Sequence, residues 1–168
     1  MFSDGVMFED LLTRRIGNFK HLVIIGMGNE LGGDDGAGIQ LSRQMKKEFR
    51  GSGKVTIIEA GTAPENYASV VQKLRPSHVL IVDAAKMGLP PGSLQIVEKN
   101  EITGFGFSTH SLPLSIFISY LEDNAAASIT VVGIEPLNTG FGKKLSKPVV
   151  DGIGKLMALL RHIARSAS

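Results

Sequence analysis

The sequence contains no cysteine among its 168 residues. Without a thiol, the protein can form no disulfide, use no thiolate nucleophile and build no cysteine-based zinc site. Cytoplasmic proteins rarely depend on disulfides, so this composition is compatible with the cytoplasm, where we expect the protein to act. Any chemistry must then come from carboxylates, imidazoles, hydroxyls or backbone groups.

The sequence also lacks an excess of charge and a long apolar run. Eighteen basic residues stand against sixteen acidic ones, for a net charge of +2, so the charge balance indicates neither nucleic acid nor a membrane surface. No apolar run approaches the ~20 residues that span a bilayer, so we expect no membrane insertion. Residues 1–20 carry acids and lack the apolar stretch of a signal peptide. A hydrophobic content of 43% in a chain of this length predicts one folded domain.

The most informative segment is a glycine-rich run between an expected strand and an expected helix. The apolar run 21–25 leads into Gly-Met-Gly-Asn-Glu-Leu-Gly-Gly-Asp-Asp-Gly-Ala-Gly at 26–38, and apolar residues then recur every four positions up to residue 49. Such turns usually bind phosphate through free backbone N–H groups. Here Asp34 and Asp35 lie at the mouth of the helix, where they would repel phosphate. A cation is therefore the more natural ligand.

A nucleotide-binding module is the main alternative for this segment. Gly26 and Gly28 match the first two glycines of the dinucleotide fingerprint, but Leu31 occupies the third position, where a side chain would crowd helix against strand. The acidic residue that ends the next expected strand, Glu59, lies 31 residues after Gly28, whereas the fingerprint places it ~20 residues on. The match to the fingerprint is therefore partial.

The rest of the chain alternates between expected strands and helices. Strands are predicted at 54–59, 78–82, 94–98 and 129–134, and helices at 62–74, 111–121 and 148–163. At the start of the helix 62–74, Thr62 and Glu65 fit a capping box. This pattern predicts a single three-layer α/β domain, with a twisted, mostly parallel sheet of about five strands and helices on both faces. The strand 94–98 follows a short Gly/Pro connection, so we expect it to be antiparallel or at an edge. Residues 1–20 form an N-terminal extension with a weak helical stripe, and residues 21–168 form the domain.

Three segments supply candidate site residues in this topology. With strand order 2-1-3, the loop bearing Asp34 and Asp35 leaves the first strand beside the point where Asp83 ends the third, so acids from both segments share the crevice beyond the strand ends. His110 precedes a helix in a loop that could fold over the same crevice. Two carboxylates and one imidazole suit a divalent metal with an open coordination position. The alternative is that the acids cap a helix and the histidine is solvated. A serine nucleophile is disfavoured because no Gly-x-Ser-x-Gly elbow occurs.

Several motifs together resemble the hydrogenase maturation endopeptidases, the family that trims the C-terminal tail of nickel-iron hydrogenase large subunits after nickel insertion. The resemblance covers about residues 21–160, including the run 26–38, Gly-Thr-Ala-Pro-Glu-Asn at 61–66, Leu-Arg-Pro at 74–76, Leu-Ile-Val-Asp-Ala at 80–84, Met-Gly-Leu at 87–89 and Thr-His at 109–110. The segments at 61–66, 74–76 and 87–89 resemble most the branch that serves formate-hydrogenlyase-type hydrogenases. Relatives usually begin just before the first strand, so the extension 1–20 is a departure.

The resemblance implies roles for the same three residues. It assigns the family's metal ligands to Asp35, Asp83 and His110, and these residues are also the expected catalytic residues. It implies that nickel arrives within the substrate, a large-subunit precursor, so the free enzyme need hold no metal and needs no nucleotide. Either the metal activates the water, or nickel only positions the tail and a carboxylate acts as general base. The competing functions are a non-catalytic nickel-sensing metallochaperone and a nucleotide-binding Rossmann-like module.

Overall fold

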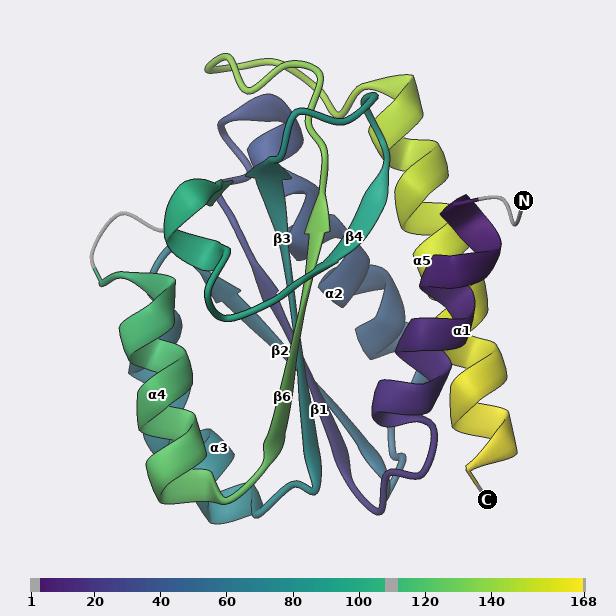
Figure 1. Cartoon of the computed structure of the whole chain (residues 1–168), viewed down its shortest axis with the longest axis vertical. Helices are drawn as coiled ribbons and strands as arrows, with labels where there is room; N and C mark the ends of the chain where they lie inside the picture. The colour runs from purple at the N-terminus through teal and green to yellow at the C-terminus, as the bar shows by residue number, and fades with distance from the viewer. Residues whose placement is uncertain (1–3, 108–111, 168) are drawn as a thin grey trace.

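The computed structural model describes residues 4–107 and 112–167, which form one six-stranded sheet covered by helices (Figure 1). The strand order is β2-β1-β3-β6-β4, and the short β5 pairs with β3. The strands are β1 (Leu22–Met27), β2 (Val55–Gly61), β3 (His78–Lys86), β4 (Leu94–Val97), β5 (Gly106–Phe107) and β6 (Ser128–Ile134). The predicted order 2-1-3 is confirmed.

The central strands are parallel and mostly apolar. All six residues of β1 are buried, because β1 lies between β2 and β3 and both of its faces are covered. β3 also pairs in parallel with β6, whereas β4 pairs with β6 in antiparallel orientation and ends the sheet. The mostly parallel α/β fold and the antiparallel edge strand at 94–98 are thus confirmed.

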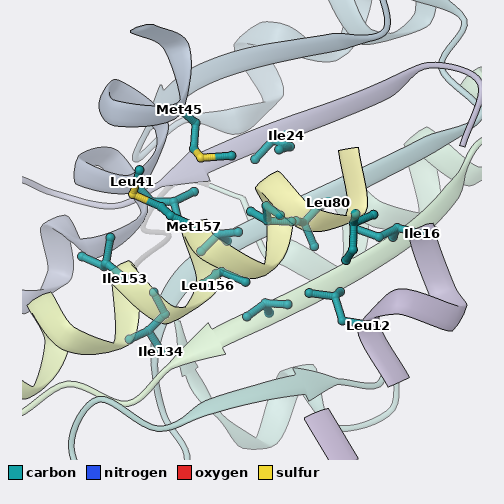
Figure 2. Close-up of a cluster of buried hydrophobic side chains, with 14 of the residues drawn as sticks. Leu12, Ile16, Ile24, Leu41, Met45, Leu80, Ile134, Ile153, Leu156 and Met157 are labelled. Atoms are coloured by element: carbon teal, nitrogen blue, oxygen red, sulfur yellow. The ribbon is translucent and has the colours of Figure 1, made fainter. Parts of the chain in front are cut away.

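The helices divide between the two faces of the sheet. They are α1 (Asp4–Ile16), α2 (Ala37–Glu48), α3 (Ala68–Leu74), α4 (Leu114–Ala125) and α5 (Lys147–Ser166). Side chains of α1, α2 and α5 join one buried cluster, and side chains of α3 and α4 join a second cluster on the opposite face. Figure 2 shows the first cluster, in which Leu41 and Met45 of α2 and Leu156 and Met157 of α5 meet apolar side chains of the sheet. The domain therefore has the three layers that the sequence predicts.

The N-terminal extension packs on the body through its helical stripe. Leu12 and Ile16 of α1 are fully buried in the same cluster as α5, and Figure 2 shows both side chains facing it. Their burial explains why this segment is a helix here, because an isolated helix of this length would be marginal in water. The boundary between extension and domain at residue 20 stays a prediction.

Two local predictions were wrong. Asp83 does not end β3, which continues to Lys86: pairing with β1 stops at Val82, but β6 and then β5 keep pairing with β3 beyond that point. The capping box at Thr62 is not formed, because the first turn is a 3-10 turn that starts at Pro64, with Ala63 as its N-cap and no side-chain cap hydrogen bond. Neither difference changes the order of the strands in the sheet.

None of the helices in the described part of the chain combines the length and the apolar character needed to cross a membrane.

Candidate active site

Asp35 and Asp83 both border Gly28, in the turn that follows β1. Gly28 has a φ of +137°, which only glycine adopts readily. A Cβ atom at this position would collide with the carbonyl oxygen of Asp35 and would lie 3.6 Å from Oδ1 of Asp83. The turn is closed by a hydrogen bond from the N–H of Asn29 to the carbonyl oxygen of Asp35 (3.0 Å). The two acids, 48 positions apart in the sequence, are therefore brought to one turn.

Asp83 is a fully buried carboxylate at the carboxyl end of the parallel sheet. It lies one residue beyond the last residue of β3 that pairs with β1, and it is opposite Gly133 of β6. A buried carboxylate is costly unless hydrogen bonds, an ion pair or a metal compensates for lost water, so its presence among apolar strands favours a chemical role. The topology confirms the predicted place of Asp83 at this end of the sheet.

Asp35 lies on the exposed side of the 3-10 turn Gly33–Gly36, which precedes α2. Its side chain is partly exposed, and a Cβ atom at Gly32 would lie 3.2 Å from its Oδ2. The glycine therefore leaves room for the carboxylate. A half-exposed carboxylate beside a cleft can reach a ligand that arrives from solvent.

Asp34 faces the opposite way and is fully buried. Its Oδ2 accepts hydrogen bonds from the N–H groups of Leu137 and Asn138 (both 2.9 Å) and from the Ser146 hydroxyl (2.8 Å), and its Oδ1 accepts one from the Ser146 N–H (2.7 Å). Burial by itself raises the pKa of Asp34, but these hydrogen bonds outweigh it and hold the pKa below its usual value. Asp34 therefore fastens the loop after β6 and caps no helix.

No local pattern distinguishes Asp34 from Asp35. Ser146 lies 112 positions beyond Asp34, and no spacing rule connects them. A resemblance that places the ligand at Asp35 was the only signal that separated the two.

His110 lies outside the described residues, as do Ser108, Thr109 and Ser111. Within residues 4–107 and 112–167, no cluster of three or more histidine, aspartate or glutamate side chains could hold a metal ion. The structure describes the positions of Asp35 and Asp83, and the roles of all three residues stay predictions. Carboxylate oxygens with one imidazole fit nickel or zinc by donor chemistry.

A cavity of about 370 Å³ opens beside the same turn. Gly28 and Gly61 lie in its wall, together with Arg43, whose guanidinium contacts Glu30 (2.6 Å) and Glu59 (2.8 Å). The hydrogen bond from Arg43 lowers the pKa of Glu30 below its usual value. From the sequence, Glu59 was a candidate only for binding a nucleotide, and no pattern indicated its ion pair with Arg43. Glu59 is engaged by Arg43, which further weakens the nucleotide fingerprint.

The close contact between helix and strand uses Gly26, the first glycine of the fingerprint, together with Gly38, which lies outside it. A Cβ atom at Gly38 would collide with the carbonyl oxygens of Met27 and Val82, and one at Gly26 would collide with that of Gly38. Leu31 is 58% exposed in the loop and crowds neither element, so the expected clash at that position was wrong. The loop is longer than a dinucleotide turn, and α2 starts only at Ala37.

Comparison with known proteins gives one consistent result. A family model described as hydrogenase maturation protease matches residues 39–162. The hydrogenase 3 maturation protease of Escherichia coli K12 is 35% identical over 132 residues, which cover 78% of this chain and 83% of that protein. A protein of Methanocaldococcus jannaschii, which its name assigns provisionally to the hydrogenase maturation proteases, is 38% identical over 134 residues, covering 76% and 79%. The crystal structure of the [NiFe] hydrogenase maturation protease HycI from Thermococcus kodakarensis superposes with a TM-score of 0.83 at 29% identity, covering 92% of this chain and 99% of that one.

Proposed function

The chain belongs to the hydrogenase maturation protease family, and from this premise we propose that it is the endopeptidase that removes the C-terminal tail of a nickel-iron hydrogenase large-subunit precursor after nickel insertion. The observation that carries the proposal is that the Asp83 carboxylate and the backbone of Asp35 meet at Gly28, at the carboxyl end of the sheet. In parallel sheets this end is where ligands bind. The protein is a peptidase, and the proposal concerns its substrate and residues.

In this proposal Asp35, Asp83 and His110 bind the nickel that the precursor carries. Oxygen and imidazole donors accept nickel, and three protein ligands leave positions for the substrate. The half-exposed Asp35 makes the first contact from solvent, and the buried Asp83 forms the floor of the site. Because the nickel arrives within the precursor, the enzyme and the precursor form a complete metal site only after nickel has been inserted. Cleavage therefore depends on nickel insertion.

Peptide hydrolysis requires a polarised carbonyl and an activated water. A divalent metal supplies both when it is bound. Alternatively the metal only positions the tail, and Asp35 or Asp83 acts as general base within hydrogen-bond reach of a water. Their surroundings differ, because Asp83 is sealed among strands whereas Asp35 borders solvent. Asp35 is therefore better placed to exchange a proton with bulk water.

The central experiment incubates the purified protein with a nickel-loaded precursor and measures the mass of the product. We expect loss of one C-terminal peptide, and no cutting of the same precursor prepared without nickel. Efficient cutting of the nickel-free precursor would leave an ordinary metalloprotease as the better description. Nickel-dependent binding without any cutting would instead support the metallochaperone. Binding of NAD or ATP in a titration would revive the nucleotide-binding alternative. The proposal places the reaction in the cytoplasm, which cell fractionation and immunoblotting check.

A further inference from the structure

Three large apolar side chains stand exposed beside the candidate active site. Leu31 is 58% exposed, Leu137 is 60% exposed and Phe141 is 85% exposed. Isolated exposed apolar residues are ordinary, but these three lie on two loops that are hydrogen-bonded to each other, and apolar side chains gathered at a surface mark interaction sites. We call these three side chains the apolar rim.

The two loops that bear the rim are joined by hydrogen bonds. The N–H of Gly142 donates to the carbonyl oxygen of Leu31 (2.9 Å), and the N–H of Asp34 donates to that of Asn138 (2.8 Å). The side chain of Asp34 also accepts from the N–H groups of Leu137 and Asn138. In Figure 1 the loop between β6 and α5 crosses above the arrowhead of β3, at the carboxyl end of the sheet. The rim is thus held in a fixed shape.

The rim is continuous with the loop that carries Asp35. Leu31 precedes Asp35 by four positions, and a Cβ atom at the intervening Gly32 would touch the Asp35 carboxylate. Lys143 and Lys144 follow Phe141 and are exposed. A Cβ atom at Gly33 would lie 3.1 Å from the Cβ of Lys143, so this basic pair stays close to the same loop. The surface beside the site therefore combines exposed apolar side chains with two lysines beside Phe141, while the exposed Glu30 beside Leu31 is paired with Arg43.

From this arrangement, and resting on the proposed function, we infer that the apolar rim is the docking surface for the folded body of the hydrogenase precursor, which presents an apolar patch flanked by acidic side chains. A tail that reaches Asp35 must leave the body of the precursor close to the mouth of the crevice, and the rim borders that mouth. Anchoring by a few apolar and aromatic side chains inside a charged border is the usual composition of a protein interface. The rim then selects the precursor, while Asp35 and Asp83 act on its tail.

The test compares Leu137→Ser and Phe141→Ser, alone and combined, with Tyr120→Ser as the matched control. Tyr120 is an aromatic side chain that is 42% exposed on α4. Leu31 is left unchanged because its loop also carries Asp35. We expect the double rim variant to raise KM for the nickel-loaded precursor about tenfold, with kcat within about twofold of wild type, since truncating interface anchors weakens binding and leaves the reacting groups in place. Tyr120→Ser should keep the wild-type KM.

A second pair of variants tests the border. Lys143→Glu with Lys144→Glu should raise KM further and weaken its dependence on salt, because a charged border steers association. An unchanged KM in the double rim variant would overturn the inference. So would a wild-type protein that is dimeric by light scattering and becomes monomeric on rim substitution, since a second copy would then occupy the rim. If the wild-type protein does not cut the precursor, the proposed function fails, and direct binding of the precursor to wild type and rim variant still decides the docking.

Discussion

The two ends of the sheet differ in what they offer to a substrate. At the amino end of β3 and β6, a cavity of about 1040 Å³ lies between the ends of α3 and α4. At the carboxyl end, the cavity beside Gly28 measures only about 370 Å³. Yet of the described residues that line the wider cavity, none is aspartate, glutamate or histidine. The narrower end holds the buried Asp83 and the half-exposed Asp35.

This difference shows that the volume of a cavity does not by itself indicate where the candidate active site lies in this fold. The amino-end cavity arises where two helices stop and turn, marked by left-handed Arg75 and Ala126. This cavity is therefore a consequence of the chain reversing direction after each helix. The carboxyl end instead combines glycine turns, which admit close backbone approach, with carboxylates that cost free energy to bury. Carboxylates that are costly to bury are expected where a protein binds its substrate and catalyses a reaction.

The largest expected effect comes from removing the ligands at the carboxyl end. Asp35→Ala, Asp83→Ala and His110→Ala should each leave the nickel-loaded precursor uncut, with kcat/KM lowered at least about a hundredfold, because metal-assisted charge stabilisation amounts to several kcal/mol. The measurement is single-turnover cleavage followed by mass spectrometry. Asp83→Asn serves as a near-isosteric control for packing.

Circular dichroism and thermal unfolding must show that each variant stays folded. Asp83→Asn should keep the fold and still lose cleavage, since the amide preserves volume and removes the charge. Wild-type-like processing by His110→Ala would refute its role as a ligand. Wild-type-like processing by both Asp83 variants would break the comparison, because the buried acid would then serve structure alone.

The next effect concerns stability and separates Asp34 from Asp35. Asp34→Ala should lower the free energy of unfolding by about 3 kcal/mol, because four donors on the loop 137–146 lose a charged acceptor. Asp35→Ala should change it by less than about 1 kcal/mol, since its side chain is partly exposed. Urea unfolding measures both. Equal losses from the two variants would contradict the division of roles.

The loss at Asp34 should depend on pH in a defined direction. The pKa of Asp34 is lower in the folded protein than its usual value of about 3.9 in an unfolded chain. Its stabilising contribution is therefore fully present above that value and disappears as pH falls through the folded pKa. The gap in unfolding free energy between wild type and Asp34→Asn should be widest near about pH 7 and shrink below about pH 4. A gap that widens on acidification would contradict the assignment.

Much of the fold could be predicted from the sequence because it follows from local patterns of apolar residues. β1 is a continuous apolar run, as expected for a strand covered on both faces, and the apolar stripe of α5 repeats with the helical period. Arg75-Pro76 ends α3 as such pairs do. The two-residue strand β5 was not predicted, because no pattern can emerge from Gly106 and Phe107 alone.

The candidate site could be predicted only in part. Topology brought Asp35 and Asp83 together, since both follow from strand order. The burial of Asp34 depends on a loop more than a hundred positions away, and the ion pairs of Arg43 join residues on three elements. Such contacts are set by packing, and no local sequence rule encodes them.

A smaller effect on stability and cleavage is expected from substituting two glycines with positive φ, one at each end of the sheet. Gly28→Ala should lower the free energy of unfolding by about 2 kcal/mol or more and reduce cleavage, because its φ of +137° suits glycine alone and a Cβ would displace Asp35. Gly51 lies at the amino end of β2, with a φ of +78° and open space around it. Gly51→Ala should cost only about 1 kcal/mol and leave kcat/KM unchanged. If both substitutions reduce cleavage alike, the turn at Gly28 has no special role.

The smallest effect is expected at the wider cavity, and it decides whether the comparison holds. Gln72 and Lys73 line that cavity from the last turns of α3, and both are exposed. Gln72→Ala with Lys73→Ala keeps good helix formers in place, so the free energy of unfolding should change by less than about 0.5 kcal/mol. Cleavage of the nickel-loaded precursor should keep its wild-type kcat and KM, because none of the described residues that line this cavity is aspartate, glutamate or histidine. A loss of cleavage comparable with that of Asp83→Ala would move the reacting centre to the amino end of the sheet. A raised KM with unchanged kcat would instead show that the precursor extends along the α3 and α4 side, well beyond the rim.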